Sequence, residues 1–353
     1  MDNLKILVTG VGAPGIKGTI YSLKNNFDKR KITIVGTDIK NDVVGKYFCD
    51  NFYTIPKPDQ TEQYLQSLLE ICSIEEIDVV LPQNTAELLI LAKNKNKFIE
   101  QGIAVVVSNE KSIQTANNKY ELLQYCERHS VPFPKYYLVD SIKKLKSAAL
   151  KLGWPEKKLA VKPPISNGMR GLRIIDEKVD RKHLFFYEKP TNLFTNLNDL
   201  IVILGSSFPE LIISEYLPGD EYTVDVLRTK INTIVIPRKR DLIRSGITFA
   251  GTTIENKSII KYTKTLSENL DLENCFGFQF KLSEDLTPKI LECNPRVQGT
   301  MVMATIAGAN IIYGAVKNAL GENLPEFDIK WGTRLHRYWG GVAISKDKLL
   351  NEI

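Results

Sequence analysis

The chain has 353 residues, 43% of them hydrophobic and 25% charged, with a formal net charge of +6; these values exclude a disordered or fibrous protein and indicate more than one packed core. The lysines are scattered and often stand beside asparagine, as in residues 93–97, so we expect no nucleic-acid partner. No apolar run approaches the ~18 residues of a membrane span and the five cysteines show no regular spacing, so we expect a cytoplasmic protein with reduced thiols and no membrane partner.

The first part of the chain alternates apolar strand patterns with helical patterns. Residues 5–9 predict a buried strand, and residues 32–37, 77–82 and 103–107 predict further strands. Strands that alternate with helices form a parallel sheet with helices on both faces. We therefore predict an α/β Rossmann-like domain over residues 1–110.

A glycine-rich turn follows the first strand. Gly10, Gly12 and Gly15 fit the G-x-G-x-x-G pattern of a dinucleotide-binding turn, and Asp38 ends the next strand. Taken literally, this pattern predicts an NAD(P)-dependent oxidoreductase. The segment also approaches a P-loop, but Ile16 separates the required Gly-Lys pair, so that interpretation fails. The alternative that the glycines serve a tight turn and close helix packing stays open.

A helical stretch from about Lys111 to Arg128 leads to a predicted junction at residues 131–134, and further on the segment from Leu159 predicts an apolar strand that carries Lys162. A cation on an apolar strand is costly without an anionic partner, and phosphate is the obvious candidate. Gly168 and Gly171, in the turn that follows, let the backbone approach such a ligand closely. An ordinary hairpin with a solvent-reaching lysine is the alternative.

The next pattern is a pair of strands, residues 211–217 and 221–227, around a Pro-Gly turn. Backbone groups near Glu215 and Leu217 could recognise an adenine edge, and the Glu221 carboxylate could accept hydrogen bonds from ribose hydroxyls. A half-buried hairpin with solvated acids is the alternative.

Two later segments carry charge at strand ends. Residues 236–246 place four cations after an apolar strand, which predicts either a solvated loop or a group of anion-binding arginines. Further on, Glu292 and Asn294 face the same side of a strand because side chains alternate. Their oxygens suit Mg²⁺ together with nucleotide phosphates, and Arg296 could bind a phosphoryl group or a carboxylate.

In this order, the segments resemble the ATP-grasp superfamily of ATP-dependent carboxylate–amine ligases, especially stand-alone proteins similar to the large subunit of carbamoyl phosphate synthetase. The resemblance covers most of the chain. It implies an ATP-grasp fold, α+β with two subdomains that grip ATP, over residues 111–325, after the Rossmann-like domain, and a C-terminal appendage over residues 326–353.

The resemblance also implies a role for each matched residue. The residues implied for ATP are Lys119, Lys162, Ser166, Gly168, Gly171, Glu215, Tyr216, Leu217 and Glu221. Those implied for Mg²⁺, with Mn²⁺ as an alternative, are Gln279, Glu292 and Asn294, and those implied for the chemistry are Arg296, Arg238 and Arg240. Because many relatives have a carboxylate where this chain has Gln279, one of the two usual metal sites is expected to be weaker.

The implied reaction transfers the γ-phosphoryl group of ATP to a substrate carboxylate, and an amine then displaces phosphate from the acylphosphate. Small-molecule carboxylate and amine substrates and a homodimer follow from the same resemblance. Two other classes stay open: the NAD(P)-dependent oxidoreductase and a non-catalytic ATP-binding regulatory module. The former would have no use for Lys162, Glu292 and Asn294, and the latter would lack some of them.

Overall fold

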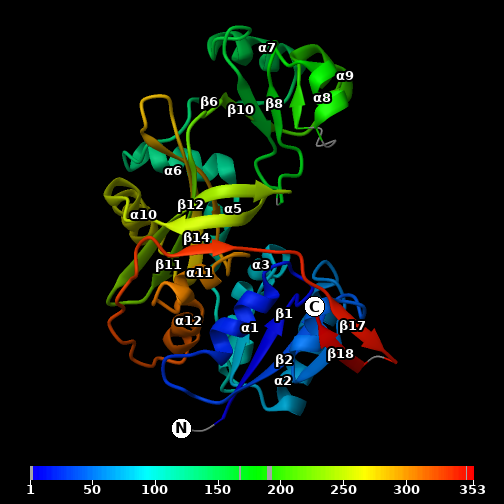
Figure 1. Ribbon diagram of the computed structural model, residues 1–353, viewed down its shortest axis with the longest axis vertical. Helices are drawn as coiled ribbons and strands as arrows, with labels where there is room; N and C mark the ends of the chain where they lie inside the picture. Colours follow the sequence, from blue (N-terminus) through cyan, green and yellow to red (C-terminus); the bar gives the residue numbers. More distant parts are fainter. Residues whose placement is uncertain (1–2, 167, 189–192, 347) are drawn as a thin grey trace. The chain divides into compact units, whose positions relative to one another are not determined.

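The computed structural model describes residues 3–166, 168–188, 193–346 and 348–353 (Figure 1). The chain divides into two units, each described by itself. Unit 1 consists of Met1–Asn117, Glu221–Gln279 and Glu292–Ile353, and unit 2 of Asn118–Asp220 and Phe280–Leu291. The domain boundaries at residues 110 and 325 stay a prediction.

The N-terminal part of unit 1 is a parallel sheet with the strand order β3-β2-β1-β4-β5. Its strands are β1 (Leu4–Thr9), β2 (Ile32–Asp38), β3 (Asn51–Thr54), β4 (Val79–Leu81) and β5 (Ala104–Val105). Its helices are α1 (Ile16–Lys24), the 3₁₀ helix η1 (Val44–Phe48), α2 (Thr61–Glu75), α3 (Thr85–Lys93), α4 (Lys95–Ile99) and α5 (Glu110–Asn117). The strand order reverses at β1, and in open parallel sheets ligands bind beyond the strand ends at such a point.

Both faces of this sheet are covered, which is why its strands are continuous apolar runs. Ile6 and Val8 of β1 are buried in a cluster that also contains Ile16 of α1. Leu7, on the opposite face, is buried with Leu68 of α2. The predicted α/β sheet with helices on both faces is therefore confirmed.

The rest of unit 1 is built around a six-stranded sheet with the order β15-β14-β11-β12-β13-β16. Its strands are β11 (Glu221–Arg228), β12 (Thr233–Arg244), β13 (Ile247–Thr253), β14 (Asn274–Leu282), β15 (Pro288–Asn294) and β16 (Arg334–His336). The helices are α10 (Lys257–Asn269), α11 (Val302–Ile306) and α12 (Ile311–Ala319), and β17 (Val342–Ser345) pairs with β18 (Lys348–Glu352). The segment predicted as an appendage thus contributes β16, which pairs with β13, to this sheet.

Unit 2 has a five-stranded sheet in the order β6-β10-β7-β8-β9. Its strands are β6 (Tyr136–Val139), β7 (Leu159–Lys162), β8 (Arg173–Ile175), β9 (Phe194–Thr195) and β10 (Leu211–Glu215), and its helices are α6 (Lys119–Arg128), α7 (Ile142–Lys151), α8 (Arg181–Tyr187) and α9 (Leu197–Leu204). Along β7, Leu159 and Val161 are buried in the core of the unit. Because side chains alternate along a strand, Lys162 lies on the other face of β7 and is half-buried.

Across the described part of the chain, every helix is too short or too polar to cross a membrane.

Candidate active site

The predicted phosphate-binding lysines of unit 2 both lie at the loop that follows β7. Lys162 ends β7, and its Nζ donates a hydrogen bond to the backbone oxygen of Leu291 at 3.0 Å. Lys119 begins α6, and its Nζ donates to the backbone oxygen of Ser166 at 2.7 Å. The backbone N–H of Lys119 also donates to the oxygen of Pro164 at 2.9 Å. Tertiary structure therefore brings the Lys119 ammonium to the loop that begins after Lys162, whereas the Lys162 ammonium bonds β15.

Two glycines of this loop have backbone conformations that residues with a side chain rarely adopt. Gly168 has a φ of +62° and Gly171 a φ of +76°. A Cβ atom on Gly171 would lie 2.6 Å from the ring of Pro163. The loop therefore needs glycine at 171. Asn167, in the middle of the predicted phosphate loop, lies outside the described residues.

We expect Lys162→Ala to weaken ATP binding by about tenfold to a hundredfold, because one hydrogen bond to a charged group contributes about 1.5–3 kcal/mol. Calorimetric titration of the variant with ATP measures this. Lys157→Ala is the matched control, since Lys157 is an exposed lysine just before the same strand. An affinity equal to that of the wild type would remove Lys162 from the nucleotide site.

The predicted adenine-binding residues lie at the end of β10 in unit 2. The carboxylate of Glu215 accepts hydrogen bonds from the backbone N–H of Lys135 at 2.8 Å and from Nζ of Lys289 at 2.6 Å. Tyr216 and Leu217 follow directly, and the Leu217 side chain is buried. Both donors bond the same carboxylate oxygen, Oε1, so one side of the Glu215 carboxylate is held by the protein.

The predicted metal ligands of unit 1 lie on β14 and β15, which are neighbours in the sheet. Nδ2 of Asn294 donates to Oε1 of Glu292 at 3.1 Å, so the prediction that both side chains face the same side of β15 is confirmed. Gln279 lies on β14. Within the described ranges, no three or more His, Cys, Asp or Glu side chains gather to hold a metal. One carboxylate and two amide oxygens fit Mg²⁺ when nucleotide phosphates complete the coordination.

Arg296 follows these ligands and contacts the Rossmann-like part of unit 1. Its Nε donates to Oγ1 of Thr85, the first residue of α3, at 3.0 Å. Burial lowers the pKa of Arg296, and the charges of Glu292 and Glu87 raise it. The guanidinium thus lies at the start of α3 and senses the charges of Glu292 and Glu87.

The structure reveals a buried acid at the start of α3 that the sequence analysis missed. The Glu87 carboxylate accepts hydrogen bonds from the hydroxyl groups of Thr9 and Tyr64 and from the backbone N–H groups of Gln83 and Asn84. Burial raises the pKa of Glu87, and these hydrogen bonds lower it. The pair Asn84 and Glu87 forms a capping box, whose spacing is visible in the sequence and could have located the start of α3.

Arg238 requires a correction. Its side chain is fully buried, with Nε and Nη2 donating to the Asp225 carboxylate at 2.6 and 2.8 Å and Nη1 donating to Oγ1 of Thr300 at 2.7 Å. A guanidinium without exposed atoms does not contact a substrate, so the predicted direct role of Arg238 in the chemistry is wrong for this structure. The arginine instead ties β12 to β11 and to the segment before α11.

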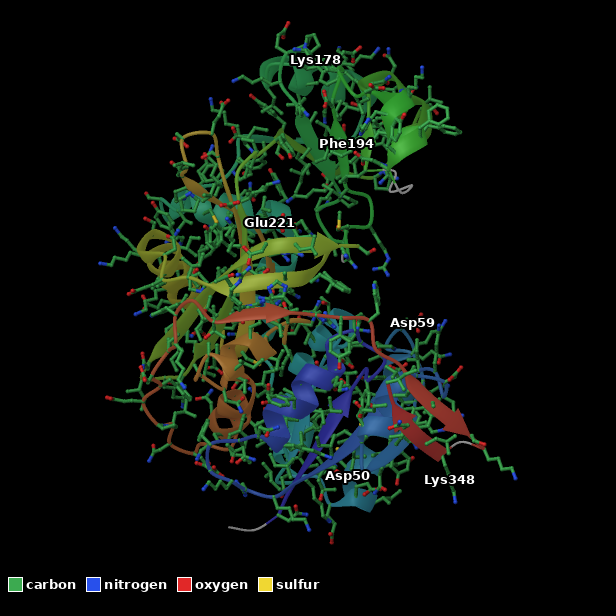
Figure 2. The ribbon with its side chains drawn as sticks, in the orientation of Figure 1. Asp50, Asp59, Lys178, Phe194, Glu221 and Lys348 are labelled. Carbon is green, nitrogen blue, oxygen red and sulfur yellow. The ribbon has the colours of Figure 1, made fainter. Side chains whose placement is uncertain are left out.

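Arg240 and Glu221, which the sequence placed in separate motifs, form an ion pair across β12 and β11. Figure 2 labels Glu221, at the start of β11. The other donors of Arg240 are also engaged, Nε with Oγ1 of Thr248 at 2.9 Å and Nη2 with the oxygen of Gly246 at 2.6 Å. Arg240 therefore holds the β12–β13 hairpin in its present conformation.

The glycine-rich turn of unit 1 packs against protein on several sides. The N–H of Gly12 donates to Oδ2 of Asp38 at 2.8 Å, where a dinucleotide-binding turn would offer its N–H to a pyrophosphate. A Cβ atom on Gly45 would lie 2.0 Å from the oxygen of Val11, and one on Gly15 would lie 2.6 Å from Cα of Gly299. This geometry favours close packing over dinucleotide binding as the reason for the glycines.

Gly15→Ala should lower the free energy of unfolding by about 1–3 kcal/mol, because the added methyl group overpacks a contact between two backbones. Urea unfolding, followed by circular dichroism, measures the change. Gly299→Ala is the matched control on the other side of the same contact, since a Cβ atom there has no atom within 4 Å. Equal stability of the Gly15→Ala variant and the wild type would contradict the packing role.

Comparison with known proteins agrees with this arrangement. Residues 207–336 match the family described as "ATP-grasp in the biosynthetic pathway with Ter operon", and residues 6–106 match "PylC-like, N-terminal domain". The large chain of carbamoyl phosphate synthase from Clostridium acetobutylicum is 22% identical over 304 residues, which are 82% of this chain and 26% of that protein. The chain thus spans about a quarter of the length of this relative.

Solved structures show the same fold at low sequence identity. N5-carboxyaminoimidazole synthetase from Staphylococcus aureus, complexed with ADP, has a TM-score of 0.68 and 16% identity, with 98% of this chain and 83% of that chain covered. The biotin carboxylase domain dimer of Hydrogenobacter thermophilus 2-oxoglutarate carboxylase, complexed with MgADP, ADP and bicarbonate, has a TM-score of 0.66 and 18% identity, with 94% and 73% covered. Residues 207–336 thus match an ATP-grasp family model, and the chain shares the fold of these two solved structures.

Proposed function

We propose that this protein is an ADP-forming carbon–nitrogen ligase that phosphorylates a substrate carboxylate and joins the resulting acylphosphate to an amine. The observation that carries the proposal is the end of β15, where Glu292 and Asn294 share one face directly before Arg296. A carboxylate and an amide oxygen suit a hard cation, and a guanidinium beside them suits the oxyanion that gains charge during phosphoryl transfer.

The phosphate-binding role falls to Lys119 and Lys162 in this proposal. Lys119 donates to a backbone carbonyl of the loop after β7 and Lys162 to one of β15. Phosphate oxygens are stronger acceptors for both ammonium groups because the hydrogen bonds are charge-assisted on both sides. Gly168 and Gly171 let the loop backbone approach a phosphate. Tyr216 and Leu217 are assigned to the adenine, and Glu221 to the ribose.

Gln279, Glu292 and Asn294 would hold the Mg²⁺ ion. When bound, the ion neutralises phosphate oxygens and helps to align them for transfer. The MgADP complex of the Hydrogenobacter thermophilus domain supports this choice of metal, with Mn²⁺ as an alternative. Because Gln279 contributes no charge, we propose that one metal position binds more weakly than the other.

The acylphosphate step requires little covalent chemistry from the protein, which mainly positions the reacting groups. Arg296 would bind the substrate carboxylate or the transferring group and hold it in line, which converts an encounter between two molecules into a step within one complex. The amine then attacks the acyl carbon, and the bond to the phosphate oxygen breaks. The substrates are proposed to be small molecules, and a homodimer in the cytoplasm is proposed by analogy with the dimeric relative.

Magnesium-dependent release of ADP and phosphate tests the proposal. Purified protein is incubated with MgATP and a panel of paired carboxylates and amines, and each product is quantified. Release that requires one pair supports a ligase and names its substrates. ATP binding without release for any pair would favour the non-catalytic ATP-binding module, and absence of ATP binding would overturn the proposal.

A further inference from the structure

Arg337 extends the edge of the six-stranded sheet in unit 1. β16 pairs with β13 through Gly251 and Leu335, and just beyond β16 the backbone N–H of Arg337 donates to the oxygen of Phe249 at 2.7 Å. Nη2 of Arg337 donates to the oxygen of Pro14, in the glycine-rich turn, at 2.9 Å. These two contacts fix the guanidinium beside the turn.

The guanidinium of Arg337 has an unmet donor. Its Nη1 is buried and has no hydrogen-bond partner among the residues that the structure describes. Burial lowers the pKa of Arg337, and no carboxylate opposes this effect. A buried donor without an acceptor costs about 1–3 kcal/mol, and more when it is charged, so an anion at this position would be stabilised.

Arg337 and a second arginine, Arg244, both lie near the ring of Phe249. The guanidinium carbon of Arg244 is 4.8 Å from the ring centroid of Phe249, and that of Arg337 is 6.0 Å from it. In the described part of the chain, neither arginine makes an ion pair with a carboxylate. Two like charges near one ring repel each other unless an anion joins them.

Aromatic surface flanks the two arginines. The ring of Trp339 lies 4.9 Å from that of Phe249, and the side chains of Tyr338 and Trp339 are both 78% exposed. Binding sites for small molecules combine such apolar walls with a few polar anchors. An anion that also carries a flat or apolar part would find both here.

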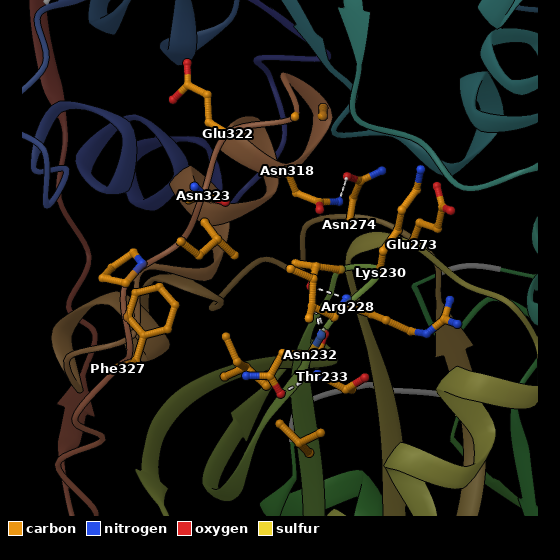
Figure 3. A pocket seen from close by; sticks show the side chains of 18 of the residues that line it. Arg228, Lys230, Asn232, Thr233, Glu273, Asn274, Asn318, Glu322, Asn323 and Phe327 are labelled. Carbon is orange, nitrogen blue, oxygen red and sulfur yellow. Dashed lines mark hydrogen bonds between the residues drawn. The ribbon is translucent and has the colours of Figure 1, made fainter.

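A cavity elsewhere in unit 1 lacks this imbalance of charge. It has a volume of about 1210 Å³ and includes Arg228, Asn274 and Asn318 in its lining (Figure 3). Nη1 of Arg228 donates to the backbone oxygen of Leu272 at 2.8 Å, and Nδ2 of Asn318 donates to Oδ1 of Asn274 at 2.8 Å. Arg228 and Asn318 therefore already have hydrogen-bond acceptors, in contrast to Nη1 of Arg337.

We propose that Arg337 and Arg244 bind an oxyanion of the acceptor substrate, either a carboxylate or a phosphate group. The inference rests on the proposed ligase function and names the chemistry of its second substrate. Its location supports this role: Pro14 contacts Arg337, and the next residue, Gly15, packs against Gly299, three residues after Arg296. The C-terminal segment thus contributes to substrate binding through Arg337.

Tryptophan fluorescence tests the proposal on the full chain, because Trp339 contacts the Phe249 ring, which lies near both arginines. The protein is titrated with inorganic phosphate and separately with benzoate, at constant ionic strength. We expect saturable changes for at least one anion, with Arg337→Gln weakening its binding about tenfold or more. Phosphate binding alone would indicate a phosphorylated substrate, and benzoate binding alone a carboxylic acid. Arg244→Gln, at the exposed tip of the β12–β13 hairpin, should weaken the binding of the same anion.

Arg334→Gln is the matched control, because Arg334 is an exposed arginine on β16, just before Arg337, and its loss changes the net charge equally. The proposal is overturned if neither anion binds the wild type, or if Arg334→Gln and Arg337→Gln weaken binding equally. ATP titration of each variant is measured in parallel. Anion binding without ATP binding would refute the ligase and keep the anion site, and ATP-dependent release with unchanged anion binding in Arg337→Gln would refute the anion site alone.

Discussion

Glu292→Gln is expected to reduce magnesium-dependent ADP release by at least about a hundredfold while leaving the fold intact. The substitution keeps the size of the side chain and removes the one carboxylate of the proposed metal set. A bound metal ion contributes several kcal/mol to stabilising transition-state charge, and each 1.36 kcal/mol is a factor of ten in rate. Glu292 is half-buried and accepts a hydrogen bond from Asn294, which a glutamine can also accept, so stability should change little.

Steady-state release of ADP at several magnesium concentrations separates the explanations. If Glu292 binds the metal, raising the magnesium concentration should partly restore the rate. Glu284→Gln is the matched control, because Glu284 is an exposed acid in the turn between β14 and β15. Full activity of the Glu292→Gln protein at low magnesium would show that Glu292 is no metal ligand.

Arg238→Met should lower the free energy of unfolding by about 3–5 kcal/mol, because it leaves the Asp225 carboxylate buried without its partner. Both side chains are fully buried in the wild type. Burial raises the pKa of Asp225, and the charge of Arg238 opposes that rise. Without the arginine the carboxyl group becomes easier to protonate. A folded pKa further above the unfolded value means that the loss of stability is smallest at acidic pH and grows as the pH rises through the folded pKa.

Urea unfolding at several pH values measures both effects. The double variant Asp225→Leu with Arg238→Met removes the charge and its partner together, and we expect it to recover most of the stability, since well-packed apolar residues often replace a buried ion pair without loss. A double variant as unstable as Arg238→Met would point to packing, with Thr300 and Met303 as the affected neighbours, and not to the unpaired charge.

Local patterns were sufficient for much of the fold. The apolar strands of the N-terminal part are continuous because both faces of a parallel sheet are covered, and this property depends only on neighbouring residues. The shared face of Glu292 and Asn294 follows from the two-residue period of a strand in the same way. The matching order of these motifs along the chain, and not any single one, carried the resemblance to the ATP-grasp superfamily.

Local patterns did not show which arginine of a strand is buried and which is not, for a physical reason. Arg238 and Arg240 lie two residues apart on β12, so strand periodicity treats them alike. The structure buries Arg238 against Asp225 and Thr300, whereas Arg240 pairs with Glu221. Thr300 is far from β12 in the sequence, and no local pattern shows which residue of β12 it will contact.

By itself, the sequence determined the class of fold and named the candidate phosphate-binding lysines and the candidate metal-binding face of β15, because each depends on spacing within a few residues. Only the tertiary structure decided that Lys119 reaches the loop after Lys162, that the glycine-rich turn packs against Gly299, and that Arg337 lies beside that turn. Each of these contacts joins residues far apart in the chain. Burial and unmet hydrogen-bond donors arise from such contacts, so they become visible only when the whole chain has packed.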